Sequence, residues 1–272
     1  MEARLQLRVQ RYGWDLAAGD YEALWQAQLA DARERLLACA GLAPGDDVLD
    51  VACGTGLVAF AAARTVGRAG HVIGVDLSER MVEAARQRSR ERNVPNTTFL
   101  RMDAGQLALP DASFDAALCA LGLMYVPEPA AALAEMRRVL RPGGRVALAV
   151  WGERGRCGWA SVFQIVDDEV ASDVCPLFFQ LGQGDALARA CAGAGFTVTG
   201  QDRFPTTLAY ASADEACDAA FVGGPAALAW SRFDVPTRER ARRRYTESIA
   251  PWRTARGYRV PGEFVVVSAT AP

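Results

Sequence analysis

The sequence predicts an α/β fold in which helices cover both faces of a mostly parallel β-sheet. Short runs rich in Val, Ile, Leu and Ala alternate with helical segments from residue 48 onward, and an acidic or Gly-rich turn follows several of these runs. Strands buried on both faces have this apolar character, and a helix is the usual connection between two parallel strands. With 272 residues, of which 51% are hydrophobic and 23% charged, the chain can bury one large core.

The first forty residues are expected to be helical, because Leu16, Tyr21, Leu24, Trp25 and Leu29 recur at loosely helical spacing. The Ala-Pro-Gly-Asp turn at 43–46 ends this segment. Apolar runs then predict five strands, at 48–51, 71–75, 97–102, 114–120 and 145–151. Helices are expected between them at 57–66, 78–92 and 128–140, where Ser78 caps the second and Arg-Pro-Gly-Gly at 141–144 ends the third.

The pattern changes after Trp151. Residues 152–182 look irregular and are rich in aromatic side chains, a helix is expected at 184–194, and a strand at 196–204. Residues 212–250 look mostly helical, and a Val-rich strand follows at 263–268. Because this closing strand is expected to return to the same sheet, the sequence predicts one sheet with helical insertions and not two separate domains.

Acidic and glycine residues fall at the carboxyl ends of the first three predicted strands. Asp50 and the Gly54-Thr55-Gly56 turn follow the first strand, Asp76 ends the second and Asp103 ends the third. In a doubly wound sheet these ends meet at one crevice, where ligands bind. The glycines let the backbone approach a ligand closely. Asp76 can accept two hydrogen bonds from a ribose diol, and Asp103 can accept one from an adenine amino group.

The glycine turn alone also fits a dinucleotide site. Residues 54–59 satisfy G-x-G-x-x-A, and Asp76 lies about twenty residues further on, as an NAD site requires. Asp50 argues against NAD, because a carboxylate directly before the loop would repel a pyrophosphate and attract an ammonium group. The third acid, Asp103, and the helical segment before the loop point the same way. A glycine turn with no ligand remains the plain structural alternative.

Four segments together resemble the class I S-adenosylmethionine-dependent methyltransferases, and are most similar to the ubiquinone and menaquinone biosynthesis methyltransferases. They are DVACGTG at 50–56, GVDLSERMVEAAR at 74–86, MDAGQLALPDASFDAALC at 102–119 and MRRVLRPGGRVALAVW at 136–151. The resemblance is strong over 45–151 and weaker over 184–211. It implies a Rossmann-like, doubly wound, seven-stranded sheet whose last strand is antiparallel. An N-terminal helical lid at 1–44, a cofactor-binding core at 45–151, and the rest of the sheet with helical cap insertions at 152–272 complete the expected organisation.

The resemblance also implies which residues bind S-adenosylmethionine and its product S-adenosylhomocysteine. Asp50, Ala52, Cys53, Gly54 and Gly56 would lie along the methionine end, and Ala52 stands where the broader pattern often has Gly. Asp76 would hold the ribose, Leu77 and Met81 would lie beside the adenine, and Asp103 and Ala104 would contact the adenine edge. Ala120 would offer its carbonyl to the methionine ammonium. The aromatic residues Trp14 and Tyr21 would close over the cofactor.

Methyl transfer is a direct displacement at a sulfonium carbon, so the protein mainly supplies alignment and a dry site. A general base is needed only for a protonated acceptor. The single His71 begins the second strand, roughly 16 Å from the end that carries Asp76, and is expected to be structural. A base would therefore have to be Asp, Glu, Tyr, Cys or water, and Tyr21 and Tyr125 are the nearest candidates. A small aromatic or lipophilic acceptor, methylated on O, N or C, is expected to contact Met124, Tyr125, Trp151, Phe178, Phe179 and Arg256.

Composition narrows the function further. The net charge of −2 argues against a nucleic acid partner, although the basic run at 238–244 leaves an RNA or protein methyltransferase open. A fold relative that catalyses another reaction also stays open. Seven scattered Cys and one His favour no metal site. The N-terminus lacks a signal-peptide pattern, and no apolar run is long enough to span a membrane, so a cytoplasmic monomer or homodimer with a small-molecule acceptor is expected.

Overall fold

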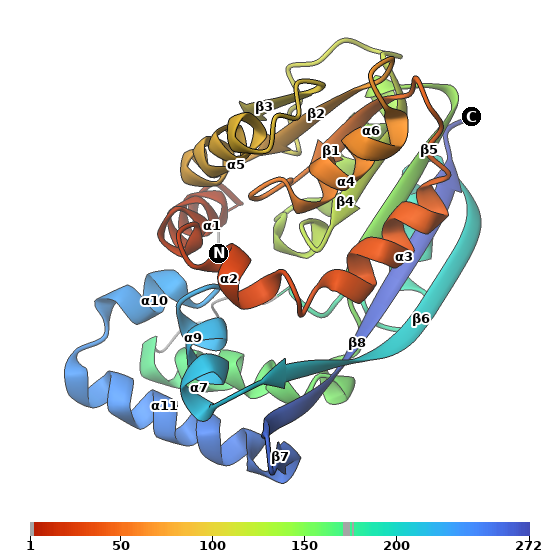
Figure 1. Ribbon diagram of the computed structural model, residues 1–272. Coiled ribbons are helices and arrows are strands. Elements are labelled where there is room, and N and C mark those ends of the chain that lie inside the picture. The colour runs from red at the N-terminus through yellow and green to blue at the C-terminus, as the bar shows by residue number, and fades with distance from the viewer. Residues whose placement is uncertain (1–2, 171–174, 176) are drawn as a thin grey trace.

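The structure, a computed structural model, describes residues 3–170, 175 and 177–272. Its sheet has the strand order β3-β2-β1-β4-β5-β8-β6, with the short β7 paired to β8 (Figure 1). The strands from β3 to β5 are parallel, whereas β8 is antiparallel to both β5 and β6. The predicted doubly wound sheet of seven main strands with an antiparallel last strand is thus confirmed.

The first half of the sheet follows the predicted alternation closely. Its elements are β1 (Asp47–Val51), α4 (Leu57–Val66), β2 (His71–Asp76), α5 (Glu79–Glu91), β3 (Thr97–Arg101), β4 (Phe114–Ala120), α6 (Pro129–Val139) and β5 (Leu140–Trp151). Ser78 caps α5 as predicted, since its Oγ accepts a hydrogen bond of 3.1 Å from the Met81 N–H. Strand β5 begins five residues earlier than predicted, because Leu140 already pairs with Phe114 and the register then shifts before Arg145 pairs with Ala116.

Three later predictions need correction. The segment 152–182 is not irregular throughout, since it contains α7 (Ser161–Val170), whose apolar residues Phe163 and Val166 face the core. Strands β6 (Thr197–Tyr210) and β8 (Gly257–Thr270) are both much longer than predicted. They form one long antiparallel pair that extends past the other strands (Figure 1). Much of β6 is exposed, and polar residues alternate along it. A search for apolar runs therefore detects only part of this strand.

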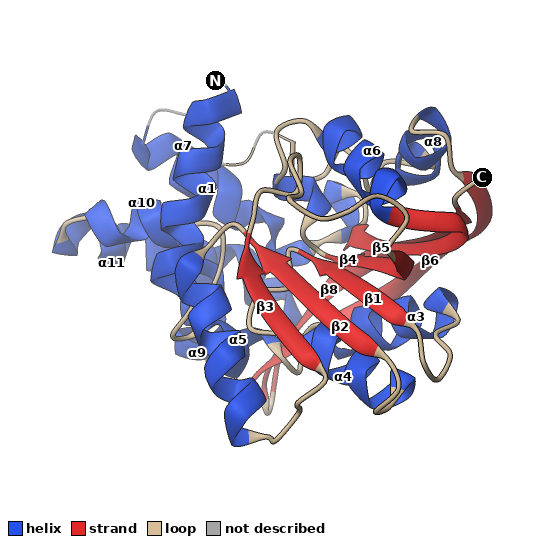
Figure 2. Ribbon diagram, turned by 90° about the horizontal axis from the view of Figure 1, so that it is seen from above, coloured by secondary structure: helices blue, strands red, loops and turns tan. Residues whose placement is uncertain are grey.

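Helices cover both faces of the sheet. Side chains of α3 (Ala30–Ala40), α4 and α5 form one core cluster with β1, β2 and β3, and α6 and α8 (Ala186–Gly193) contribute to the cluster on the other face. The remaining helices gather beyond the carboxyl ends of the parallel strands (Figure 2). These are α1 (Ala3–Ala17), α2 (Tyr21–Trp25), α7, α9 (Ala213–Phe221), α10 (Ala227–Arg232) and α11 (Val235–Ile249). Segments from both ends of the chain therefore lie over the edge where a ligand is expected.

None of the helices in the described parts of the chain is long and apolar enough to span a membrane.

Candidate functional site

A cavity of about 740 Å³, partly open to solvent, lies at the carboxyl ends of β1, β2 and β4. We name it the strand-end cavity. Ten of the residues expected to bind the cofactor line it, namely Trp14, Tyr21, Ala52, Gly54, Asp76, Leu77, Met81, Asp103, Ala104 and Ala120. They come from α1, α2, α5 and the carboxyl ends of four strands with the loops that follow them, and the parallel topology brings these segments to one place.

The glycine loop bends sharply between β1 and α4. Ala52, Gly54 and Gly56 all have left-handed backbone, with φ of 56°, 53° and 90°. Left-handed backbone costs an L-residue roughly 1–2 kcal/mol, so Ala52 is strained where a glycine would not be. Gly56 does not line the cavity. A Cβ there would lie 2.8 Å from the Phe60 ring, so this glycine permits the loop to pack on α4.

Asp76 joins the end of β2 to the glycine loop. One carboxylate oxygen accepts a hydrogen bond of 2.9 Å from the Gly54 N–H, and the other accepts one of 2.9 Å from the Ser78 N–H. Loss of hydration raises the pKa of this carboxyl to about 6, against the opposing effect of these N–H donors. Asp76 lines the cavity, and each of its oxygens can accept a further hydrogen bond, as recognition of a diol requires.

Asp50 lies in a second cavity of about 460 Å³ that adjoins the first, and we name it the Asp50 cavity. The side chain is 1% exposed, and its Oδ2 has no hydrogen-bond partner among the described residues. Burial, followed by the charge of Asp76, raises the pKa of Asp50 to about 8, although the Ala59 N–H opposes this. A buried carboxylate oxygen without a partner is costly, and a cationic group placed beside it would remove that cost. The Asp50 cavity therefore fits the ammonium end of an aminoacyl ligand.

The far end of the strand-end cavity is less polar. Leu77 and Met81 offer apolar surface, and the Asp103 Oδ1 accepts a hydrogen bond of 2.9 Å from the Gly105 N–H. Asp103 and Ala104 are neighbours in the cavity lining. A flat heterocycle with an exocyclic amino group fits this arrangement.

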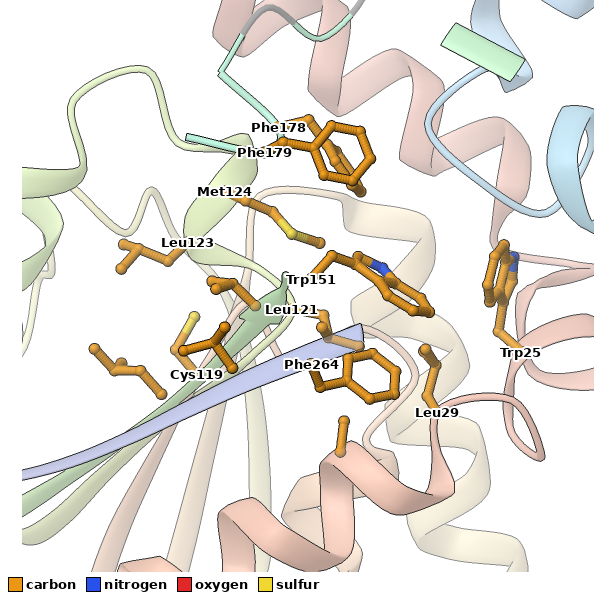
Figure 3. Packing of buried hydrophobic residues seen from close by; sticks show 14 of the residues in the cluster. Trp25, Leu29, Cys119, Leu121, Leu123, Met124, Trp151, Phe178, Phe179 and Phe264 are labelled. Carbon is orange, nitrogen blue, oxygen red and sulfur yellow. The ribbon is translucent and has the colours of Figure 1, made fainter. Parts of the chain in front are cut away.

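Aromatic side chains enclose a third cavity of about 450 Å³, which we name the aromatic chamber. Four residues expected to contact the acceptor, Met124, Tyr125, Trp151 and Phe178, line it. Figure 3 shows Met124, Trp151 and Phe178 converging from different segments, with Trp25 and Leu29 across from them. Among the described residues that line the chamber, no side chain carries a formal charge. The chamber suits an apolar, uncharged molecule.

Tyr21 and Leu121 each line all three cavities. Leu121 follows β4 and has a left-handed φ of 59°, a strained conformation for a side chain of this size. Its N–H is held by the Ala149 carbonyl at 2.8 Å. The two residues mark the point where a ligand in the strand-end and Asp50 cavities would face a ligand in the aromatic chamber.

The two candidate catalytic phenols lie on this boundary but are not poised as bases. Tyr21 and Tyr125 flank Trp14, with ring centroids 5.8 and 5.1 Å from it. Loss of hydration, and for Tyr21 also the charges of Asp76 and Asp50, raises the pKa of both phenols. Both groups therefore keep their proton at neutral pH and act as hydrogen-bond donors.

The structure moves two predicted acceptor residues away from the chamber. Phe179 packs behind its wall, with its ring centroid 4.7 Å from that of Phe178, because successive residues in a turn point in different directions. Arg256 lies in the turn between β7 (Arg253–Thr254) and β8 and lines a separate surface groove. Neither residue lines the aromatic chamber. His71, at the start of β2, bonds the Thr98 hydroxyl at 2.9 Å and touches none of the three cavities.

Cys53 has a buried thiol in the Asp50 cavity, and burial raises its pKa well above the ordinary value. Within the described residues, no group of three or more His, Cys, Asp or Glu side chains is arranged to hold a metal ion.

Several lining residues were not predicted as site residues. Leu7 and Gln10 of α1 line the strand-end cavity, Arg33 lines the Asp50 cavity, and Trp25 and Trp159 line the aromatic chamber. The aromatic enrichment of 152–182 drew attention to Trp159, but nothing in one sequence separates a chamber wall from ordinary core.

The basic run at 238–244 is largely paired with acidic residues. Arg240 bonds Glu169 at 2.5 Å, Arg242 bonds Asp214 at 2.7 Å and Asp218 at 2.9 Å, and Arg244 bonds Asp168 at 2.5 Å. These pairs tie α11 to α7 and α9. The run therefore serves the packing of these helices and offers little net positive charge to a polyanion.

The comparisons with known proteins agree with this geometry. Residues 48–144 match the methyltransferase domain family. The chain is 39% identical over 119 residues to demethylmenaquinone methyltransferase from Listeria welshimeri, which is 44% of this chain and 50% of that protein. It thus spans about half the length of the curated relatives that it matches.

Solved structures share the fold across almost the whole chain. The 4+2 cyclase SpnF superposes with a TM-score of 0.62 at 22% identity, covering 93% of this chain and 84% of its own. Phosphoethanolamine N-methyltransferase 2 from Haemonchus contortus, in complex with S-adenosylhomocysteine, gives a TM-score of 0.61 at 17% identity, covering 100% and 60%. At these identities the likeness establishes the fold alone. The similarity in sequence is thus to a methyltransferase domain over residues 48–144 and to demethylmenaquinone methyltransferases.

Proposed function

We propose that this protein transfers a methyl group from S-adenosylmethionine to a small, uncharged, apolar acceptor bound in the aromatic chamber. One observation carries the proposal. The chamber shares Tyr21 and Leu121 with both cavities that hold the predicted cofactor residues. A cofactor and an acceptor placed in these spaces would therefore meet at one boundary.

Each part of the cofactor has a matching group. The unpartnered Asp50 oxygen would receive the ammonium, the two Asp76 oxygens the ribose hydroxyls, and Asp103 with Ala104 the adenine edge. Leu77 and Met81 would cover the adenine face. When bound, S-adenosylmethionine supplies an electrophilic methyl group on a sulfonium that is already a good leaving group.

The protein's own contribution is alignment and exclusion of water. Trp14 and Tyr125 separate the strand-end cavity from the aromatic chamber, and the chamber walls are apolar. Proximity of two bound reactants alone can supply several kcal/mol of the barrier reduction. Because both phenols keep their proton, Tyr21 and Tyr125 would orient the acceptor through hydrogen bonds, and no general base of the protein is invoked.

The N-terminal segment 1–44 would act as a lid. Asp15 accepts a hydrogen bond of 2.6 Å from the Ser78 hydroxyl, and Glu22 pairs with Arg88 at 2.6 Å and with Arg92 at 2.7 Å. These contacts hold α1 and α2 over the cavity from the α5 side. Residues 45–151 would then be the cofactor-binding core, and the helices within 152–272 would cap the acceptor. A monomer or homodimer suffices for such a site.

Calorimetry with S-adenosylhomocysteine and with NAD tests the cofactor. We expect micromolar binding of the first and none of the second, and binding of NAD alone would overturn the proposal. Incubation with methyl-labelled S-adenosylmethionine then tests the reaction against neutral aromatic alcohols and ketones, small amines, and an RNA pool. Labelled product is expected with the first class only. Cofactor binding without product from any class would instead favour a fold relative with another chemistry.

A further inference from the structure

The outer side of α1 carries most of the exposed large apolar side chains of the described chain. Leu5 is 45% exposed, Tyr12 46% and Leu16 50%, and Val235 at the start of α11 is the one other residue of this kind among the described residues. Single exposed apolar side chains are common on protein surfaces, whereas a contiguous group marks an interaction site. The arrangement of the three side chains on α1 therefore decides which case applies.

Leu5, Tyr12 and Leu16 form one line along the helix, which we name the α1 stripe. At 3.6 residues per turn they fall within about 40° of one another around the helix axis, and at 1.5 Å of rise per residue the stripe is roughly 16 Å long. Gln10 and Trp14, on the other side of the helix, line the strand-end cavity. Figure 1 shows α1 on the outside of the molecule, beside α5 and α10. The stripe thus faces away from the site.

Three arginines lie along one flank of the α1 stripe. Arg4, Arg8 and Arg11 fall about 60–120° from Leu5 around the helix axis, and none of them has a carboxylate partner among the described residues. The Arg11 guanidinium lies over the Tyr12 ring, 4.6 Å from its centroid. The outer side of α1 therefore joins an apolar line to a row of unpaired cations.

The acids near this surface are already engaged. Asp15, the acid within α1, accepts hydrogen bonds from the Ser78 hydroxyl at 2.6 Å and the Arg80 N–H at 3.2 Å. Glu79 and Glu83 of α5 each pair with an arginine of their own helix. The other neighbour, α10, contains no acidic residue. The surface is thus locally positive although the whole chain has a net charge of −2.

We propose that the α1 stripe docks on the surface of a membrane that contains anionic lipids. A helix with an apolar side and arginines beside it lies in the plane of the interface, with its apolar side chains among the acyl chains and its cations at the lipid phosphates. The helix would lie on the membrane and not cross it. The inference does not depend on the proposed function, because no residue of the stripe or its basic flank lines any of the three cavities.

Other occupants fit the α1 stripe less well. A second copy of the chain in a two-fold contact would bring the same three arginines against one another, and like charges repel. A stable protein partner usually buries about 800 Å² on each side, whereas the stripe offers three half-exposed side chains in a narrow line. A lipid surface requires no matching shape, and its phosphates complement the free guanidinium groups.

Sedimentation of the full chain with lipid vesicles tests the proposal. One set of vesicles contains equal amounts of phosphatidylglycerol and phosphatidylcholine, and the other contains phosphatidylcholine alone. Binding is measured at low salt and at about 0.5 M salt, where charges are screened within a few ångströms. Circular dichroism melting curves of every variant verify that it is folded.

Two pairs of variants separate the apolar and the charged contributions. L5Q/L16Q removes two apolar side chains of the stripe, with V235Q as its control at the exposed apolar residue outside α1. R4Q/R8Q removes two cations of the flank. Its matched control is R64Q/R68Q, two exposed arginines in and after α4 that also have no carboxylate partner among the described residues.

We expect wild type to bind the anionic vesicles at least about tenfold more tightly than the neutral ones, and to lose most of this preference at high salt. An arginine near an anionic surface contributes about fivefold in affinity, so R4Q/R8Q should bind the anionic vesicles at least about tenfold more weakly. L5Q/L16Q should bind them at least about fivefold more weakly. Both controls should stay within twofold of wild type. If one α1 variant fails to fold, the other still decides.

Absence of binding to the anionic vesicles would overturn the inference, as would wild-type affinity in both α1 variants or an equal loss in the controls. A dimer in analytical ultracentrifugation that dissociates in L5Q/L16Q would instead assign the stripe to a second copy. Failure of the proposed function would be seen separately, because S-adenosylhomocysteine binding and methyl transfer are measured without vesicles.

Discussion

The Asp76 carboxylate accepts a hydrogen bond of 2.9 Å from the Gly54 backbone N–H, so the end of β2 holds the loop that follows β1. The same carboxylate lines the strand-end cavity. One side chain thus both shapes the glycine loop and faces the expected ribose. The loop and the acid are separate motifs in the sequence, and this contact makes them a single unit.

Replacing Asp76 by Asn should therefore weaken cofactor binding. Asp76→Asn keeps the size but removes the charge and one acceptor oxygen. Charge-assisted hydrogen bonds contribute about 1.5–3 kcal/mol each, so we expect S-adenosylhomocysteine affinity to fall roughly 10- to 100-fold by calorimetry. Glu79→Gln, on the exposed first turn of α5, is the control. Affinity within twofold of wild type in D76N would show that Asp76 does not face the ligand.

Removing the Asp50 charge should stabilise the ligand-free protein. The folded-state pKa of Asp50 is about 8, against an ordinary value of 3.8. The unfolded chain releases this proton first as pH rises, so the group costs the folded state increasing stability between pH 4 and pH 8. At pH 8, Asp50→Asn should have a higher melting temperature than wild type, and its free energy of unfolding should be larger by about 1–5 kcal/mol. The two proteins should unfold alike near pH 4. A lower melting temperature for the variant at pH 8 contradicts this account.

The same substitution should have the opposite effect on ligand binding. An ammonium group beside Asp50 favours the ionised carboxylate, so wild-type affinity for S-adenosylhomocysteine should rise between pH 6.5 and pH 8 as Asp50 loses its proton. Calorimetry in buffers of different ionisation enthalpy should detect proton release on binding at pH 7. D50N should bind more weakly and release fewer protons. Unchanged proton release would mean that Asp50 does not meet the ammonium.

Weakening the Glu22 contacts should speed cofactor exchange. Glu22 is held between Arg88 and Arg92 and also accepts a hydrogen bond of 3.3 Å from the Thr55 hydroxyl. A half-buried ion-pair network of this kind contributes about 1 kcal/mol, so Glu22→Gln should raise the dissociation rate of S-adenosylhomocysteine up to about fivefold in stopped flow. Glu83→Gln breaks the exposed pair with Arg80 and should leave the rate unchanged. Equal rates in all three proteins would argue that α2 does not move when the ligand leaves.

Removing either phenol should have a modest effect on turnover. A lost neutral hydrogen bond costs about 0.5–1.5 kcal/mol, whereas loss of a general base usually costs 10²- to 10⁴-fold in rate. Because both phenols stay protonated, Tyr21→Phe and Tyr125→Phe should each keep kcat within about tenfold once an acceptor is known. A loss of more than a hundredfold in one variant, with kcat of wild type rising with pH, would identify that tyrosine as a base.

Much of the candidate site could be predicted because it depends on local sequence. The run of apolar residues predicts strand β2 and the acid at its end. The turn residues predict the glycine loop at 54–56, and capping chemistry predicts the role of Ser78. Parallel topology then places strand ends at one edge, which is why Asp76 and Asp103 came together as expected.

The acceptor side could not be predicted to the same depth. Phe178 and Phe179 are neighbours in sequence, yet one lines the chamber and the other packs behind it. Arg256 was expected to contact the acceptor, but it lines a surface groove that is separate from the aromatic chamber. The periodicity of apolar residues in the sequence indicates that a side chain is buried. It does not indicate whether that side chain borders a cavity or fills the core.

The sequence by itself determined the fold class and pointed to the candidate cofactor residues, because both depend on short segments with fixed backbone chemistry. Only the tertiary structure decided which residues line the aromatic chamber, how deeply Asp50 is buried, and that two indole N–H groups lack a hydrogen-bond partner among the described residues. Trp25 and Trp159 are more than a hundred residues apart in the chain, and both line one chamber only because α2 and the segment after β5 pack on the same end of the sheet. Such a meeting results from the packing of many side chains, which no single stretch of sequence specifies.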